Sequence, residues 1–304
     1  MTTTTTTNTI GKEQTIGCEI EFNNITRAKA AEALANHFGT QAIYYGGGYY
    51  EWHIKDQTGR TWKIERDSSI QGQDDQKCEM VSPILHYDDL ETLQEVARQI
   101  RHAGGKSSPE RGCGVHIHIG KGDHTAQSIR NLANMMAAHE TLLTASLNIA
   151  EDRLGWYCRP VDPKFIERIN KAKPKTLAEM QNLWYDGCDM SHRHYDPSRY
   201  HILNLHATWS KGTIEFRAFN FTKERGIHAG ELKAWVHLCL AMSNQAKRIK
   251  TASPRETQQD NQKYAMRCWL LRLGFIGEEY ATSREHLCKH LTGDAAFRHG
   301  RTAA

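Results

Sequence analysis

The stretch "GCEIEFNN", residues 17–24, alternates apolar and acidic side chains. Successive side chains of a β-strand point to opposite faces of the sheet, so Cys18, Ile20 and Phe22 form an apolar face. Glu19 and Glu21 form an acidic face, on which two neighbouring like charges repel each other. We therefore expect either that water screens this face or that a cation lies between the two carboxylates.

The same alternation recurs in three other predicted strands, "CEMVSP" (residues 78–83), "CGVHIHIG" (residues 113–120) and "GTIEFRAFN" (residues 212–220). Their polar positions on one face are Glu79, the pair His116 and His118, and the pair Glu215 and Arg217. Neighbouring strands lie about 4.8 Å apart, and residues on the same face of one strand lie about 7 Å apart. If the four strands share a sheet, four carboxylates and an imidazole can therefore surround two divalent cations. Oxygen-rich ligand sets favour Mg²⁺ or Mn²⁺ over Zn²⁺.

Each motif also has a purely structural interpretation. The Glu-x-Glu pair is typical of a solvated strand face, and the two histidines can be surface residues. Glu215 and Arg217 can form an exposed ion pair, which would contribute at most ~1 kcal/mol. The joint occurrence of three dyads favours a functional site over three unrelated coincidences.

Composition excludes several classes of protein. The chain has 304 residues, of which 39% are hydrophobic and 24% charged, and no apolar run approaches the ~20 residues of a membrane span. Residues 1–14 are polar, lack a secretory signal, and are expected to form a disordered Thr-rich tail. Eight cysteines without a C-x-x-C pair favour reduced thiols and a cytoplasmic location. The net charge of +4 is dispersed, which makes nucleic acid an unlikely partner.

Helical patterns between the strands predict an α+β fold rather than a doubly wound α/β fold. "YHILNLHA" (residues 200–207) is predicted to form a strand before the one that contains Glu215. Residues 151–198 are expected to be an irregular lid or substrate region, in which Trp156 and Trp184 contribute core or lid packing. The C-terminal segment, residues 251–304, is predicted to be a polar linker followed by a small helical appendage.

Six stretches, in this order, resemble one known family: "GCEIEF", "ERDSSI", "CEMVSP", "CGVHIHIG", "RYHILNLHA" and "GTIEFRAFN". They are similar to the amidoligase family of glutamine synthetase-like carboxylate–amine ligases, which is related to the glutamate–cysteine ligases. The resemblance covers roughly residues 15–245 and implies a catalytic domain over residues 15–250. It implies a curved, mainly antiparallel sheet flanked by helices, with ATP and two or more Mg²⁺ or Mn²⁺ ions in its concavity.

The resemblance also implies roles for individual residues. The implied metal ligands are Glu19, Glu21, Glu79, His116 and Glu215. The implied ATP-binding residues are His118, Arg199, Asn204 and Arg217, of which Arg217 would face the phosphates as a catalytic residue. Asp67 and Ser69 match the acidic residue and the serine of the family's D-G-S turn, and would bind substrate, with Asp67 also catalytic. Ser68 stands where that turn has glycine, and an ordinary Asx turn is the alternative interpretation.

The implied reaction is formation of an amide bond through an acyl phosphate, for which divalent cations neutralise the phosphates and an arginine stabilises the transferred group. The acid and the amine remain open, as does whether either is a small molecule, a peptide, a protein or a modified nucleobase. The sequence does not identify the general base, the pathway or the oligomeric state. Three other functions stay open: a phosphotransferase on the same fold, a metal-dependent hydrolase that uses His116, His118 and the carboxylates, and a binding protein without activity. The hydrolase would leave Arg217 unexplained.

Other stretches carry weaker signals. "AGGKSSP" lacks the first glycine of a phosphate-binding loop, and "GGGYYEW" lacks its lysine, so a flexible hairpin is the better interpretation. "SHRHYDP", with His192 and His194, favours a mobile lid or substrate loop over a metal site.

Overall fold

The computed structural model describes residues 9–257 and 260–298, and within them the chain is an α+β protein built on one eight-stranded sheet with ten helices. The strands are β1 (Ile16–Phe22), β2 (Ala42–Gly46), β3 (Glu51–Lys55), β4 (Thr61–Glu65), β5 (Cys78–Val81), β6 (Val115–Gly120), β7 (Leu203–Asn204) and β8 (Thr213–Phe219). Their order is β2-β3-β4-β5-β1-β6-β8-β7, and every pairing is antiparallel. The predicted fold class is confirmed at this level.

The four strands that carry the polar motifs lie side by side in the middle of the sheet, as β5-β1-β6-β8. Their alternation explains why: the apolar positions, such as Ile20, Ile117 and Ile214, are fully buried on one face. A shift of register by one residue would move these side chains to the other face and expose them. The hydrophobic pattern therefore determines which face carries the charged side chains.

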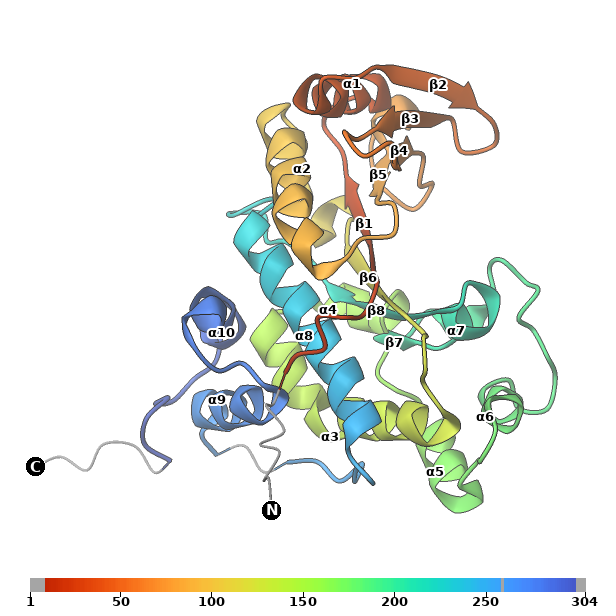
Figure 1. Ribbon diagram of the computed structural model, residues 1–304, viewed down its shortest axis with the longest axis vertical. Helices are drawn as coiled ribbons and strands as arrows, with labels where there is room; N and C mark the ends of the chain where they lie inside the picture. Colours follow the sequence, from red (N-terminus) through yellow and green to blue (C-terminus); the bar gives the residue numbers. More distant parts are fainter. Residues whose placement is uncertain (1–8, 258–259, 299–304) are drawn as a thin grey trace, which may run out of the picture.

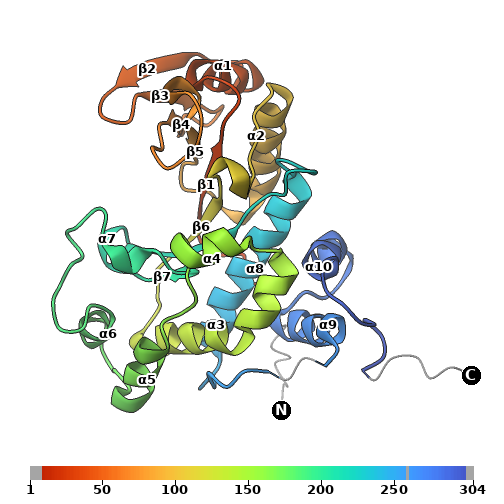
Figure 2. The same ribbon diagram turned by 180° about the vertical axis from the view of Figure 1, so that it is seen from behind.

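Helices cover the apolar face of the sheet, where α1, α2 and α8 follow one another along one side of the strands (Figures 1 and 2). The helices are α1 (Arg27–Phe38), α2 (Leu90–His102), α3 (Ala126–Leu147), α4 (Glu151–Trp156), α5 (Pro163–Ala172), α6 (Leu177–Trp184), α7 (His206–Ser210), α8 (Ala229–Arg248), α9 (Gln262–Leu273) and α10 (Ala281–Cys288). Their ends follow capping chemistry: the Thr26 hydroxyl accepts from Lys29 N, and Gly39 ends α1 with a left-handed φ of 65°. This layer leaves the opposite, polar face of the sheet open.

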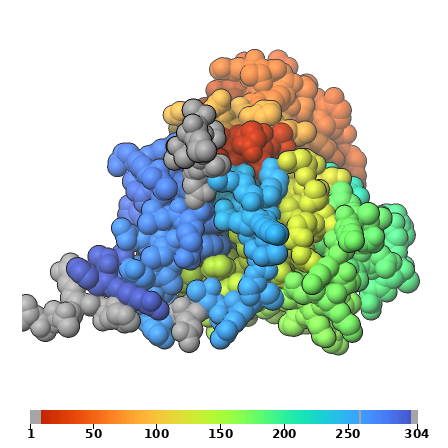
Figure 3. All heavy atoms as spheres, turned by 60° about the horizontal axis from the view of Figure 1, so that its bottom comes forward, coloured from red at the N-terminus to blue at the C-terminus, as the bar shows by residue number. Residues whose placement is uncertain are grey.

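Helix α8 is the centre of the molecule, because it packs against β6 on one side and against α2, α3 and α10 on others. The C-terminal helices lie beside it on the face shown in Figure 3. His237 of α8 contacts Ser283 of α10 (Nδ1 to Oγ, 2.9 Å), and Ser146 donates to Leu287 O (2.6 Å). The predicted appendage is thus helical and part of the core; its residues 258–259 and 299–304 lie outside the described part.

The N-terminal segment differs from the expected disordered tail over residues 9–14, while residues 1–8 lie outside the described part. Ile10 is completely buried, and Gln14 donates to Leu240 O (3.0 Å). Asn244 donates to Thr9 O (2.6 Å). One buried apolar side chain and two hydrogen bonds to α8 fix a segment whose composition is otherwise polar.

The structure also corrects what was expected of two segments, residues 151–198 and residues 200–207. Residues 151–198 are not irregular, because they contain α4, α5 and α6. Trp156 is 77% exposed and packs into neither core nor lid, whereas Trp184 packs edge-on against Phe165. The strand predicted in residues 200–207 is reduced to Leu203–Asn204, because the chain turns into α7 at His206.

None of the helices within residues 9–257 and 260–298 combines the length and the apolar character needed to cross a membrane. All eight cysteines are free thiols, and five of them are buried.

Candidate functional site

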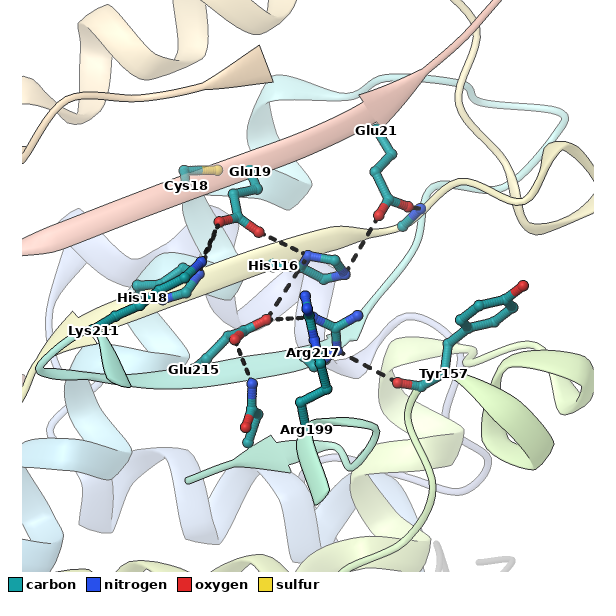
Figure 4. A network of polar contacts seen from close by, with 12 residues as sticks. Cys18, Glu19, Glu21, His116, His118, Tyr157, Arg199, Lys211, Glu215 and Arg217 are labelled. Atoms are coloured by element: carbon teal, nitrogen blue, oxygen red, sulfur yellow. Dashed lines mark hydrogen bonds and ion pairs between the residues drawn. The ribbon is translucent and has the colours of Figure 1, made fainter. Parts of the chain in front are cut away.

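The three dyads converge on the open face of the sheet (Figure 4). In the strand register Glu19 lies opposite His116, and His118 lies opposite Glu215. His116 is the centre: its Nδ1 lies 3.0 Å from Glu19 Oε2 and 3.9 Å from Glu215 Oε1, and its Nε2 lies 3.7 Å from Glu21 Oε1. The imidazole of His116 therefore contacts three carboxylates, which come from the two strands that flank β6.

Glu79 lies directly opposite Glu21 and adds a fourth carboxylate. The carboxylate of Glu79 makes no hydrogen bond and no ion pair with any residue in the described ranges. Burial raises the pKa of Glu79 well above its ordinary value, and Glu19, Glu21, Asp67 and Glu65 raise it further. Among four other carboxylates, and with no cation of the described residues within ion-pair distance, the charged form of Glu79 would be stabilised by a cation that binds from outside.

Two other carboxylates of the cluster are held in their charged form by the protein itself. Burial alone would raise the pKa of Glu19, but His118, His116 and Lys211 outweigh it and keep that pKa well below its ordinary value. Burial likewise opposes ionisation of Glu215, but Arg217 and the histidines lower its pKa to about 2. Both groups are therefore anionic at neutral pH.

Arg217 forms a buried ion pair and not the exposed pair considered from sequence. Its Nη1 donates to Glu215 Oε1 (2.6 Å), and its side chain is 5% exposed against 3% for Glu215. Its Nε also donates to Tyr157 O (3.4 Å). Because both partners have left water, removal of either leaves an unpaired buried charge, which makes this pair much more important for stability than a surface pair.

Basic side chains line the same cavity as the carboxylates. Arg153 of α4 is buried, and its Nη2 donates to Arg217 O (3.0 Å). Lys211 Nζ lies 3.5 Å from Glu19 Oε1, and Arg199 lines the same cavity. Gly114 allows this arrangement, because a Cβ atom there would lie 2.2 Å from Arg153 Nη1. The motif "CGVHIHIG" thus needs its first glycine, Gly114, for close approach of the guanidinium.

Both groups line one cavity of about 530 Å³. Its lining runs from Gly48 and Tyr49 at the β2–β3 turn to Arg199 and Tyr200 before β7, so the open face is concave. The predicted residues on its lining are Glu19, Glu21, Asp67, Ser69, Glu79, His116, Arg199 and Arg217.

A second cavity of about 290 Å³ adjoins the first, and both are lined by His194, Arg199 and Lys211. Asn204 donates to Glu215 Oε2 (2.6 Å), but its Oδ1 atom has no hydrogen-bond partner in the described part of the chain. His206 Nε2 is likewise unpartnered among the described residues, while its Nδ1 bonds to Tyr185 OH (2.6 Å). Both residues are at least nine-tenths buried, so these two atoms indicate that a polar ligand completes the second cavity.

Two predicted residues differ in detail from expectation. His118 lines neither cavity; its Nε2 lies 3.3 Å from Glu19 Oε1 and its Nδ1 lies 2.9 Å from Thr213 Oγ1. Asp67 accepts from Ser69 N (2.7 Å), which is the Asx turn considered as the alternative, and the turn itself lines the larger cavity. Glycine is not needed at Ser68, whose φ is not among the positive values.

Sequence reasoning missed three residues of this site: Glu65, Arg153 and Lys211. Glu65 lies opposite Glu79, and burial with nearby Glu51 and Glu19 raises its pKa to about 7, although Lys63 opposes this shift. The alternation of "TWKIERD" contained a signal for Glu65, because Lys63, Glu65 and Asp67 are two residues apart. Arg153 comes from a helix that was not predicted, and no pattern marks it.

The donor atoms fit a hard divalent cation. Three overlapping groups each place their ligand atoms within 4.8 Å of one another: Glu19–Glu79–His116, Glu19–His118–Glu215 and Glu21–Asp67–Glu79. Oxygen ligands predominate, as Mg²⁺ and Mn²⁺ require. A fourth group, His228–Glu231–His286, lies elsewhere, and there Lys289 and Arg225 already pair with Glu231.

The comparisons with known proteins agree with the motifs. A family model described as "Putative amidoligase enzyme" matches residues 12–243. No curated protein matches the sequence. Among solved structures, a bifunctional glutathione synthetase from Pasteurella multocida is similar with 10% identity and a TM-score of 0.44, over 92% of this chain and 48% of that chain. The chain spans about half the length of that protein, and a likeness this weak carries no argument about function.

Proposed function

Because the chain belongs to the amidoligase family, as its ordered motifs predicted, we propose that it is an ATP- and Mg²⁺-dependent ligase that joins a carboxylate to an amine. The observation that carries this proposal is Glu79, a carboxylate among four others with no cationic partner in the described part of the chain. A site built in this way needs a multivalent cation. The basic side chains that line the same cavity, Arg153, Arg199 and Lys211, need an anion, which the phosphates of ATP would supply.

Two metal positions follow from the donor groups in this proposal. Glu21, Glu79 and Asp67 would hold one Mg²⁺ or Mn²⁺ ion, and Glu19, His116 or His118, and Glu215 would hold the other. Bound metal would screen the phosphate charge and bring the triphosphate close to the acid. His118 would then act as a metal ligand or orient Glu19, which replaces its expected contact with the nucleotide.

The nucleotide would occupy the second cavity, with its phosphates between Arg199 and Lys211. The unpartnered Asn204 Oδ1 and His206 Nε2 support a polar group of the nucleoside there. From this position the γ-phosphate would point into the larger cavity, whose lining includes Arg217 and Arg153. The planar fork of a guanidinium binds two phosphoryl oxygens at once, which lysine does not.

The proposed reaction has two steps. A carboxylate oxygen of the acid attacks the γ-phosphorus, the bond to the β-phosphate oxygen breaks, and ADP leaves. The amine nitrogen then attacks the carbonyl carbon of the acyl phosphate, and inorganic phosphate leaves while the nitrogen loses a proton. Arg217 and Arg153 would stabilise the transferred phosphoryl group. Asp67 and Ser69 would bind one of the substrates at the rim of the cavity.

Two finer assignments belong to the same proposal. A concave, antiparallel sheet with the site on its open face is what a glutamine synthetase-like fold requires, and we assign that fold to residues 15–250. The absence of disulfides among the cysteines agrees with a cytoplasmic location.

The test is ADP formation from ATP and MgCl₂ with pools of carboxylic acids and amines, with products identified by mass spectrometry. We expect ADP release to need both substrate classes and to yield a product with the mass of acid plus amine minus water. Release of ADP with a stable phosphorylated acid and no need for amine would instead identify a phosphotransferase. Cleavage of amides without nucleotide would identify a hydrolase.

A further inference from the structure

The open face of the sheet continues without interruption from the site to the edge strand β2. Directly opposite residues point to the same face, and one such row runs through Ile43, His53, Lys63, Val81, Glu19 and His116. Ile43 of β2 therefore lies on the same face as the candidate metal ligands. The β2–β3 turn beyond it, at Gly48 and Tyr49, lines the larger cavity.

The outer edge of β2 is unusually unprotected. Within the described residues β2 pairs only with β3, and at the top of Figure 1 its other side has no neighbouring element. Ile43, Tyr44 and Tyr45 are 52%, 52% and 67% exposed. The strand has no charged residue and no proline, which are two of the devices that prevent pairing at an edge; its short length and the register shift between Tyr44 and Gly46 limit the regular open stretch to Ala42–Tyr44. The opposite edge strand, β7, is only two residues long.

We propose that β2 is the docking edge for a polypeptide substrate, which adds an extended strand to the sheet and passes its reactive end into the cavity. This proposal rests on the proposed ligase function and narrows its substrate class. An extended polypeptide chain satisfies the free N–H and C=O groups of a strand edge, whereas a small metabolite does not. Ile43 and Tyr45 offer side-chain contacts on the site face, where the Tyr45 ring stacks on His53 with centroids 4.0 Å apart.

A second copy of this chain fits the edge less well. The β2–β3 register shifts between Tyr44 and Gly46, so the regular part of β2 is only Ala42 to Tyr44. Pairing of two such short strands buries far less than the ~1,200 Å² that stable protein interfaces need. A polypeptide that continues past Tyr49 gains further contacts in the cavity.

The sheet geometry predicts a minimum length for the substrate. An added strand would lie five strand spacings from β1, or about 24 Å. An extended chain covers at most about 3.4 Å per residue, so about seven residues must separate the docked segment from the reacting group. A substrate with a shorter spacer would bind but would not react.

The experiment uses a library of synthetic 15-residue peptides with free termini, whose binding to the full chain is measured by fluorescence anisotropy. Bound peptides are then assayed for ATP-dependent ligation to the amine or acid pool. Ile43→Lys and Tyr45→Lys place a charge on the exposed edge, and we expect each to weaken binding at least tenfold. KM should rise in proportion, while kcat at saturating peptide stays unchanged. Ile276→Lys is the matched control, because Ile276 is 59% exposed and follows α9, away from the edge.

N-methylation along a bound peptide gives an independent signature. Only alternate residues of an added strand point their N–H groups at the edge, so methylation at every second residue should abolish binding and methylation between them should not. Equal affinity of the edge variants, no alternation, or no binding by any peptide would overturn the proposal. Self-association that Ile43→Lys abolishes would overturn it in favour of a dimer edge.

The same experiment separates this proposal from the ligase function. ADP release with small acids and amines but no peptide binding leaves the ligase standing and removes the docking edge. Peptide binding at β2 without any ADP release supports the edge and contradicts the ligase.

Discussion

Arg217 combines a buried ion pair with a place on the lining of the cavity. It forms a buried ion pair with Glu215, and the same guanidinium lines the cavity beside Arg153. The dyad Glu215-x-Arg217 predicted that the two side chains share a face, but it could not predict their burial. Burial depends on Tyr157, Arg153 and Asn204, which come from distant parts of the chain.

We expect Arg217→Lys to reduce turnover about a hundredfold, because loss of one transition-state contact of ~3 kcal/mol has that effect. We also expect a loss of roughly 1–3 kcal/mol in the free energy of unfolding, since lysine cannot replace both hydrogen bonds that the buried guanidinium donates, to Glu215 and to Tyr157 O. The measurements are ADP release per folded molecule and urea denaturation. Arg66→Lys is the control, because Arg66 also lines the cavity but pairs with the exposed Asp74. Wild-type turnover in folded Arg217→Lys protein would remove Arg217 from the mechanism.

Glu79→Gln should have opposite effects on stability and on metal binding. Without metal the variant should melt at a higher temperature than the wild type, because one repelling carboxylate has been neutralised. With Mg²⁺ and ATP its gain in melting temperature should be smaller, because a ligand is missing. Thermal melts with and without MgCl₂ test both signs, and Glu91→Gln on the exposed side of α2 is the control. An unchanged response to Mg²⁺ would contradict the assigned metal position.

At the level of helices and strands, alternation located the four site strands, and the helical patterns between them predicted the α+β class. The helices in residues 151–198 were missed although their start signals are present. Asp162 caps α5 directly before Pro163, and Thr176 caps α6 with Glu179 three residues later. The apolar residues of α5, Phe165, Ile166 and Ile169, also follow a helical period, but a period over only ten residues did not outweigh the irregular sequence around it. The predicted length of β7 was wrong for the opposite reason: the alternation of "YHILNLHA" continues into residues that fold as α7.

The β3–β4 hairpin depends on one aspartate. Asp56 is buried and accepts from Thr58 N (2.9 Å), Arg60 Nε (2.9 Å) and Trp62 Nε1 (3.2 Å). Asp56→Ala leaves the buried indole N–H of Trp62 unpaired and removes the acceptor of Thr58 and Arg60, so we expect a loss of about 3 kcal/mol in the free energy of unfolding. Urea denaturation at pH 7 measures this loss, with Asp75→Ala in an exposed turn as the control. A loss below about 0.5 kcal/mol would show that the turn forms without Asp56.

For the molecule as a whole, the sequence predicted the fold class, the family and most of the acidic wall of the cavity. Of the basic side chains that line the cavity, it predicted Arg199 and Arg217 but not Arg153 and Lys211, which reach the cavity only through the packing of α4 and the turn after α7. It also did not predict that the C-terminal helices are part of the core. Their contacts with α8 join residues that are far apart in the chain, and such contacts leave no local pattern.

These contacts predict a dependence of stability on pH. His237 of α8 is completely buried, and its ring nitrogens contact Tyr87 OH (3.2 Å) and Ser283 Oγ (2.9 Å). Burial, together with the nearby charge of Lys233, lowers the pKa of His237 to about 3. In the unfolded chain the pKa returns to about 6.5, so below that pH only the unfolded state binds the proton. Stability is therefore fully present above pH ~6.5 and declines as the pH falls toward 3, by about 1.4 kcal/mol per unit.

Between pH 7.5 and pH 5, His237 should account for a loss of about 2 kcal/mol in the free energy of unfolding. In His237→Gln that contribution disappears, so the variant should lose about 2 kcal/mol less than the wild type over the same interval, even if it is less stable at pH 7.5. Some dependence will remain, because burial also lowers the pKa of His124 to about 4. Urea denaturation at both pH values measures the difference, and His102→Gln at the exposed end of α2 should behave as the wild type. An identical pH dependence in His237→Gln would contradict this prediction, because it would mean that the His237 ring gains a proton in the folded state. The contacts of the ring with α10 allow that only if the C-terminal helices separate from α8.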